Sequence, residues 1–233
     1  LGLVGSEMCI RDSFGTLEQA FDSSEVFTNA LAAKENMRTE SFAQKLCVSS
    51  QGNVDCIKNA QLEEGQKGLL FSLSNHKVLY ANGIYDKVYP ASITKIMTAM
   101  LALQSGKLND TVTITQDNVT LEDGSQVCGF VAGDQVTLDQ LLHCLLVYSG
   151  NDAASAIAEY VGGSTENFVQ MMNDYAAKLG CTGTHFSNPH GLQDENHYTT
   201  PYDIYLMLNE AFTYPEFTEI TELPSYTLSL IHI

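Results

Sequence analysis

Residues 89–103 read YPASITKIMTAMLAL. Apolar residues recur at helical spacing from Ile96 to Leu103, and Gly106 supplies a stop, so the stretch predicts a helix. Ser92 and Lys95 stand three residues apart at its start, which puts both side chains on one helix face within hydrogen-bond reach. This polar pair is the first candidate for chemistry in the chain.

A serine hydroxyl is a poor nucleophile unless a neighbouring base takes its proton. Lys95 can be that base if burial lowers its pKa, and the positive end of the helix would also stabilise an oxyanion near the Ser92 amide. The alternative is a capping serine beside a solvated lysine, and the pair taken alone favours that alternative. A second such pair, Ser74 and Lys77, falls at a predicted hairpin tip, where both side chains are expected to be solvated.

Outward from this stretch, the sequence predicts a few strands followed by a helical body. GLLFSLS (68–74) and KVLYANG (77–83) form a predicted hairpin, and TVTIT (111–115) a further strand. Caps and stops delimit the later helices: a capping box at Thr137–Gln140, a break at 149–151, glycines at 162–163, a cap at Ser164 or Thr165, Gly180 as a C-terminal stop, and Thr200-Pro201 with Asp203 reaching back to the cap.

Ser149-Gly150-Asn151 interrupts this helical body between two apolar helices. It puts two short polar side chains where packing would favour Leu or Ala, which makes the break a second candidate for chemistry. The alternative is a simple turn between helices, capped by Asn151 or Asp152.

Composition excludes several classes of function. The 233 residues include 28 Asp and Glu against 11 Lys and Arg, for a net charge of −17, and 44% are hydrophobic. Nucleic acid and anionic lipid are disfavoured as partners because both need clustered basic residues. The hydrophobic content predicts a globular chain, and no apolar run approaches the roughly 18 residues of a membrane span.

The ends and the cysteines need separate treatment. Residues 1–13 and 227–233 resemble translated adapter or vector sequence, so we expect them to be foreign and leave them out of the fold prediction. Residues 14–64 form a polar extension without assignable chemistry.

Cys47 and Cys56 flank a short polar loop, and we hypothesise a disulfide between them worth about 2.5–3 kcal/mol. Without a C-x-x-C pair or clustered histidines, a metal site is not expected.

Ser-x-x-Lys and Ser-x-Asn together are two of the three elements of penicillin-binding proteins and class A β-lactamases. The longer strings at 89–103, 124–164 and 168–208 closely resemble the low-molecular-mass D-alanyl-D-alanine carboxypeptidases, serine peptidase family S11. The resemblance runs from about Gly68 to Leu208.

The resemblance implies a role for each matching residue. Ser92 is the expected nucleophile and Lys95 its general base, and Ser149 relays a proton to the leaving D-alanine. Asn151 holds Lys95 and the substrate amide, and Gly150 is expected at the substrate-binding site. Peptidoglycan stem peptides are the implied substrates and β-lactams the implied covalent inhibitors, with no metal or organic cofactor.

The implied fold is α/β and β-lactamase/transpeptidase-like: an antiparallel sheet flanked by helices, plus a helical subdomain containing residues 149–151. Residues 65–226 would form a partial catalytic domain outside the cytoplasmic membrane. The third element, Lys-Thr/Ser-Gly, is absent, and Lys178 is the last Lys or Arg in the chain. We therefore expect the C-terminal strands, and any membrane-anchoring segment, to be missing and the fragment to have little activity.

Two other functions stay open. A class A β-lactamase-like hydrolase needs a further Glu to activate water, for which Glu159 and Glu166 are available. A non-catalytic muropeptide-binding module would need no third element. The string 188–192 also resembles the family, but we interpret it as structural, because His190 has no Ser-Asp pair nearby to support a triad.

Overall fold

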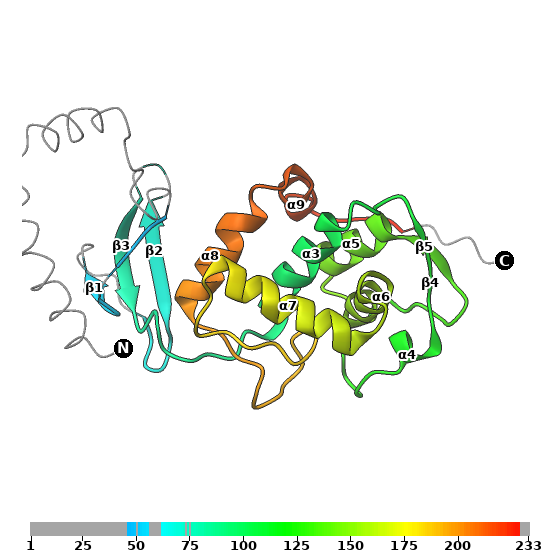
Figure 1. Ribbon diagram of the computed structural model, residues 1–233, viewed down its shortest axis with the longest axis horizontal. Helices are drawn as coiled ribbons and strands as arrows, with labels where there is room; N and C mark the ends of the chain where they lie inside the picture. Colours follow the sequence, from blue (N-terminus) through cyan, green and yellow to red (C-terminus); the bar gives the residue numbers. More distant parts are fainter. Residues whose placement is uncertain (1–45, 50, 56–61, 73, 75, 229–233) are drawn as a thin grey trace, which may run out of the picture. The chain divides into compact units, whose positions relative to one another are not determined.

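The computed structural model describes residues 46–49, 51–55, 62–72, 74 and 76–228, and they form a mixed α/β fold (Figure 1). The predicted foreign leader at 1–13, most of the polar extension and residues 229–233 lie outside these ranges, so the predicted domain boundaries stay predictions. In the part of the chain that is described, no helix is long and apolar enough to cross a membrane.

The predicted hairpin is confirmed. Strands β2 (Gly68–Ser72) and β3 (Lys77–Asn82) pair antiparallel, with Leu70 opposite Tyr80 and a bulge after Leu70. A two-residue strand, β1 (Val54–Asp55), pairs with the other edge of β3, giving the order β1-β3-β2. The sequence did not predict β1, because two residues are too few to show a period.

A central helix follows the sheet. The 3-10 turn η1 (Ala91–Thr94) leads into α3 (Lys95–Gln104), which contacts α5, α6, α7 and α8. A helix surrounded by other helices buries side chains on all its faces, and Met97, Ala99 and Met100 are completely buried.

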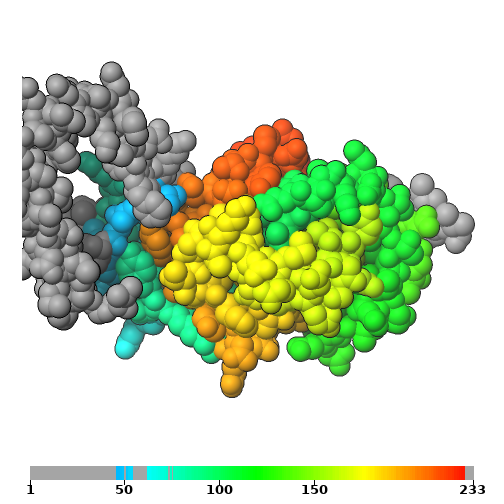
Figure 2. Space-filling model, viewed as in Figure 1, coloured from blue at the N-terminus to red at the C-terminus, as the bar shows by residue number. Residues whose placement is uncertain are grey.

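The surrounding elements are mostly those that the sequence predicts. The helices are α5 (Leu138–Val147), α6 (Asn151–Gly162), α7 (Thr165–Leu179) and α8 (Pro201–Ala211), with α4 (Gln116–Val119) and α9 (Pro215–Thr221) in addition. The space-filling view shows α7 in yellow beside the yellow-green surface of α6, against which it packs (Figure 2). A second antiparallel sheet pairs β4 (Thr111–Thr113) with β5 (Gln135–Thr137).

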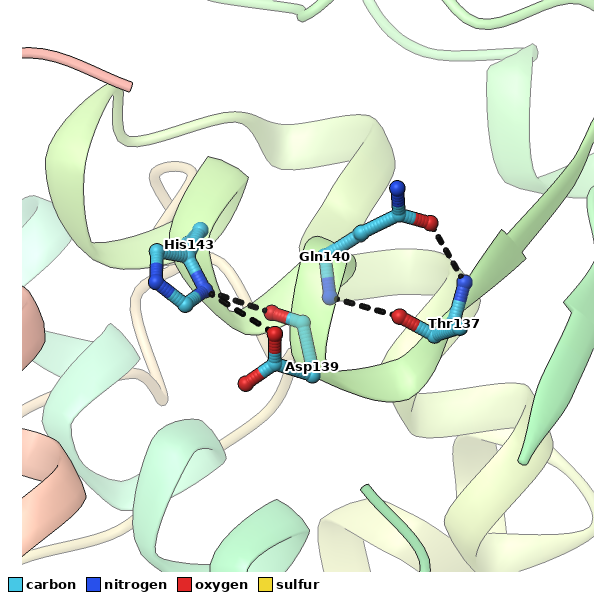
Figure 3. A network of polar contacts seen from close by, with 4 residues as sticks. All are labelled: Thr137, Asp139, Gln140 and His143. Atoms are coloured by element: carbon cyan, nitrogen blue, oxygen red, sulfur yellow. Dashed lines mark hydrogen bonds and ion pairs between the residues drawn. The ribbon is translucent and has the colours of Figure 1, made fainter. Parts of the chain in front are cut away.

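Local signals set the helix ends. Thr137 and Gln140 form the predicted capping box of α5, and Asp139 accepts a hydrogen bond from His143 one turn later (Figure 3). Ser164 caps α7, and Gly180 ends it in the left-handed conformation at φ 85°.

The cap of α8 differs from the prediction. The hydroxyl of Thr200 accepts a hydrogen bond from the backbone N–H of Asp203, as expected of a capping threonine. The carboxylate of Asp203 does not reach back to the cap. It accepts hydrogen bonds from the Gly183 N–H and the Thr184 hydroxyl, and so fixes the chain after α7 to α8.

Cys47 has a free, fully buried thiol, which does not support the predicted bridge to Cys56. Cys56 itself lies outside the described residues. The backbone of Cys47 accepts a hydrogen bond from the Tyr202 hydroxyl and donates one to the Tyr205 hydroxyl. Contacts with α8 therefore hold this part of the polar extension against the fold.

Candidate active site

The amine of Lys95 lies at the centre of the site. The residue is only 3% exposed, and its Nζ contacts three oxygen atoms: Ser92 Oγ at 3.3 Å, Asn151 Oδ1 at 2.7 Å and the backbone oxygen of His190 at 2.9 Å. These acceptors come from three separate parts of the chain and match the three protons of an ammonium group.

The surroundings of Lys95 prepare it to give up a proton. Burial lowers its pKa to about 8, although Cys128 and the carboxylate of Asp152 act in the opposite direction. A pKa near 8 leaves a useful fraction of neutral amine at physiological pH, and the lone pair of that amine can accept the proton of Ser92.

Ser92 is exposed, directly above its buried partner. It shares a cavity of about 450 Å³ with Lys95 and Ser149. Ala91, which precedes Ser92, has φ 47°, and Ser149 has φ 64°, both in the left-handed region that non-glycine residues rarely adopt. Strain of this kind persists where the surrounding structure enforces it, and it is common at functional sites.

The Ser149-Gly150-Asn151 break forms the turn between α5 and α6. Asn151 is buried at the first position of α6 and faces Lys95, as the family resemblance implies. The Ser149 hydroxyl lines the cavity, and among the described residues it makes no direct hydrogen bond to Ser92 or Lys95. Gly150 is buried, and its N–H donates to the Cys144 carbonyl at 3.1 Å, so that the fold itself uses this donor.

The loop 188–192, interpreted from sequence as structural, also takes a direct part in the site. Its His190 carbonyl contacts Lys95, and its Pro189 carbonyl accepts a 2.6 Å hydrogen bond from Thr98 on α3. Gly191 has φ 92°, and a Cβ there would lie 1.9 Å from the Ala91 oxygen, so the loop packs directly under the turn that carries Ser92. Sequence gave no signal for these contacts, because any residue type presents a backbone carbonyl.

His197 supports the same turn from a buried position. Its Nδ1 accepts the backbone N–H of Ser187 at 3.0 Å, which leaves the proton on Nε2, and Nε2 donates to Thr94 Oγ1 at 2.7 Å. Burial lowers the pKa of His197 to about 4, so the ring is neutral at pH 7. Thr94 stands between Ser92 and Lys95, and His197 therefore holds the nucleophile turn without touching either residue.

Neither glutamate of the β-lactamase alternative faces Ser92. The carboxylate of Glu159 accepts hydrogen bonds from Thr115, at 2.8 Å, and from Asn118, at 2.5 Å, and so holds α4 on α6. Glu166 is exposed in the first turn of α7.

Comparison with known proteins identifies the family of the chain. Residues 58–232 match the model of the D-alanyl-D-alanine carboxypeptidase family, peptidase S11. D-alanyl-D-alanine carboxypeptidase DacF of Bacillus subtilis is 37% identical over 162 residues, covering 68% of this chain and 41% of the relative. DacC of Escherichia coli is 40% identical over 149 residues, covering 60% of this chain and 37% of the relative. The chain thus spans about two fifths of the length of these relatives.

Solved structures share the fold. A D-alanyl-D-alanine carboxypeptidase from Mycobacterium tuberculosis superposes with a TM-score of 0.68 at 31% identity, covering 76% of this chain and 70% of that one. Penicillin binding protein 6B from Escherichia coli gives a TM-score of 0.62 at 33% identity, covering 65% and 51%. The mixed α/β fold is thus that of penicillin-binding proteins, and the chain belongs to the D-alanyl-D-alanine carboxypeptidase family of serine peptidases, S11.

Proposed function

We propose that the protein containing this chain is a serine-type D-alanyl-D-alanine carboxypeptidase, which removes the terminal D-alanine from peptidoglycan stem peptides. One observation supports this most strongly. The amine of Lys95 is buried beside Ser92 Oγ, with Asn151 and the His190 carbonyl fixing its position. A nucleophile beside a base of lowered pKa, oriented by a third group, is the arrangement that acyl transfer requires.

In the acylation step, neutral Lys95 takes the proton of Ser92 as Oγ attacks the carbonyl carbon of the penultimate D-alanine. The tetrahedral intermediate then collapses, and the bond to the terminal D-alanine nitrogen breaks. The proton held by Lys95 has to reach that nitrogen. Ser149 opens on the same cavity, and we assign it the relay of this proton.

In the deacylation step, water attacks the ester on Ser92, and the shortened peptide leaves with a free carboxylate. Asn151 serves both steps, since it orients Lys95 and can also receive the substrate amide. For Gly150 the support is weaker, because its N–H already bonds to Cys144. A β-lactam would acylate Ser92 in the same way and leave slowly.

We further propose that this chain alone has little activity. No Lys or Arg follows Lys178, and the sequence contains no Lys-Thr-Gly element to bind the substrate carboxylate. Strand β2 is at an edge of the three-stranded sheet within the described residues, and further strands carrying that element could pair with it there. Because the proposed substrate is peptidoglycan, we also propose that the protein acts in the cell envelope, outside the cytoplasmic membrane.

A class A β-lactamase-like activity is the second candidate, and the contacts of Glu159 and Glu166 count against it. A non-catalytic muropeptide-binding module is the third. Two features count against a module. A surface that only binds peptide needs neither a buried base beside an exposed serine nor strained backbone at Ala91 and Ser149.

A fluorescent penicillin tests the proposal. The chain joined to the downstream sequence of its own gene should become labelled stoichiometrically at Ser92, release D-alanine from a D-alanyl-D-alanine peptide, and hydrolyse nitrocefin only slowly. Ser92→Ala and Lys95→Ala should abolish both labelling and release, while Glu64→Gln, on an exposed carboxylate without an assigned role, serves as the control. Peptide binding without acylation would favour the module, and rapid nitrocefin turnover lost in Glu159→Gln would favour the β-lactamase.

A further inference from the structure

Two cysteines lie in contact behind the Ser149-Gly150-Asn151 turn. Cys144 is buried on α5, and Cys128 is half-buried in the loop between α4 and β5. The Sγ of Cys128 lies 3.9 Å from the Cys144 carbonyl oxygen, and both residues line one cavity of about 360 Å³. Both have free thiols. The cavity gives a small reagent a route to the pair.

Both cysteines lie close to Gly150. The Gly150 N–H donates to the Cys144 carbonyl at 3.1 Å. A Cβ added to Gly150 would lie 2.4 Å from the Cys128 sulfur. Gly150 therefore packs closely against the backbone of one cysteine and the side chain of the other.

Hydrogen bonds connect the Cys128 loop to the start of α6. The Asp152 carboxylate accepts the N–H groups of Cys128, at 2.9 Å, and Gly129, at 3.0 Å. The Asn151 N–H donates to the Gln126 carbonyl at 2.8 Å. A displacement of Cys128 would therefore be transmitted to Asn151, which holds Lys95.

We propose that Cys128 and Cys144 form a redox modification site, which closes to a disulfide by exchange with a small-molecule disulfide such as glutathione disulfide. The S–S bond would require the two sulfurs to approach to about 2.05 Å, closer than two unbonded thiols can lie. This approach would move the Cys128 sulfur, which packs closely against Gly150, and would thereby shift the Ser149–Asn151 turn.

The exchange balances as two thiol–disulfide steps. A thiolate of the pair attacks the small disulfide, forming a mixed disulfide and releasing one small thiolate. The second thiolate of the pair then attacks the cysteine sulfur of the mixed disulfide and expels the second small thiolate. The pair loses two electrons and two protons, and the small disulfide becomes two thiols.

The electrostatics indicate an order for these steps. The hydrogen bond from the Cys128 thiol lowers the pKa of Cys144, while the same hydrogen bond, burial and the carboxylate of Asp152 raise the pKa of Cys128. This order of acidity favours Cys144 as the attacking thiolate, which a reagent would reach through the cavity that both cysteines line, and Cys128 then completes the exchange.

The sequence offers a clean measurement of the bond. No Lys or Arg occurs between Lys107 and Lys178, so trypsin releases both cysteines in the single peptide 108–178, which contains no other cysteine. The purified chain is equilibrated with reduced and oxidised glutathione, quenched in acid and alkylated. We expect this peptide to lose two hydrogen atoms and to take up no alkylating reagent, and dithiothreitol should restore two alkylated thiols.

Single variants supply the controls. Cys128→Ser and Cys144→Ala should each leave one thiol that is alkylated or carries glutathione, while Cys181→Ala should close the bridge as the wild type does. Two alkylated thiols in the wild type at every glutathione ratio, or bridges from either cysteine to another part of the chain, would overturn the proposal.

The effect on the turn is measured separately. Oxidation should shift the amide resonances of Gly150 and Asn151 and leave that of Lys178 unchanged, and unshifted Gly150 and Asn151 resonances in the oxidised chain would contradict the coupling. Any consequence for peptidoglycan chemistry rests on the proposed function. The mass and resonance measurements do not, because neither needs an active enzyme.

Discussion

Lys95 donates a 2.7 Å hydrogen bond to the side-chain oxygen of Asn151, which lies 56 positions later in the chain. This contact joins the first turn of α3 to the first turn of α6. It also stabilises the charged form of a lysine whose pKa burial has lowered to about 8. Asn151 therefore helps to set how much neutral base is present.

Two replacements of Asn151 should move the pKa of Lys95 in opposite directions. Asn151→Leu removes an acceptor of the ammonium and should lower the pKa by about one unit, whereas Asn151→Asp supplies a carboxylate and should raise it by about 1–3 units. The 13Cε resonance of Lys95 followed through a pH titration measures both. Asn167→Asp, on an exposed part of α7, is the control. Equal pKa values in all three variants would remove Asn151 from this role.

Acylation of Ser92 should rise with pH and level off near pH 8. Only neutral Lys95 can accept the serine proton, and well below its pKa the neutral fraction grows about tenfold per pH unit. The rate of labelling by a fluorescent penicillin, measured from pH 5 to 9 in the chain extended by its downstream sequence, gives the profile. In Asn151→Asp the whole profile should move to higher pH. A profile without slope across this range would exclude Lys95 as the base.

Gly191→Ala should destabilise the fold far more than an ordinary left-handed glycine would. The new Cβ would meet the Ala91 oxygen at 1.9 Å and the Ala91 carbonyl carbon at 2.4 Å, and these backbone atoms cannot rotate away as a side chain can. We expect a loss of more than about 4 kcal/mol in urea unfolding. Gly180→Ala isolates the conformational part of the cost, because Gly180 has φ 85° and open space around it, and should lose about 1 kcal/mol. Similar losses for the two variants would contradict the close packing of loop 188–192 under Ser92.

His197 should make the fold sensitive to acid. Its pKa is about 4 in the folded chain against an ordinary value near 6.5, so between these values the unfolded chain binds a proton that the native chain does not. Stability should therefore fall as the pH drops from 6.5 to 4. The pKa of His190 is also about 4, lowered by burial and by the charges of Lys95 and His197, and His190 adds to this loss.

Two variants separate the charge of His197 from its hydrogen bonds. His197→Gln can still accept from Ser187 and donate to Thr94, so it should keep most of the stability at pH 7 and lose part of the acid dependence. His197→Ala leaves both partners without their bonds and should cost about 2–4 kcal/mol. Urea unfolding at pH 7 and pH 4.5 measures both effects. If His197→Gln lost as much stability between pH 7 and pH 4.5 as the wild type does, the acid sensitivity would come from other groups.

Much of the local structure follows from the sequence, because its causes lie within a few residues. The Thr137–Gln140 box, the Gly180 stop and the hairpin of β2 and β3 are each fixed by neighbouring side chains and allowed backbone angles. The spacing of Ser92 and Lys95 likewise fixes their shared face. Family resemblance added the connection from this pair to Asn151, which no local rule could supply.

Other features have causes distant in the sequence. Strand β1 exists because β3 offers it an edge, and the Asp203 carboxylate turns to Gly183 instead of its own cap because that donor is nearer in the fold. The Cys47–Cys56 hypothesis depended on loop length alone and took no account of the α8 tyrosines that hold Cys47.

The sequence by itself determined which residues could do the chemistry: a serine at the start of a helix, a lysine on the same face and a polar break in a helical body. Only the tertiary structure decided that Lys95 is buried, that the His190 carbonyl contacts it, and that Cys128 and Cys144 meet behind Gly150. The physical reason is that burial and backbone hydrogen bonds depend on what packs around a residue. A base is created by the removal of water from an amine, and that water is removed by segments up to 95 positions away in the chain.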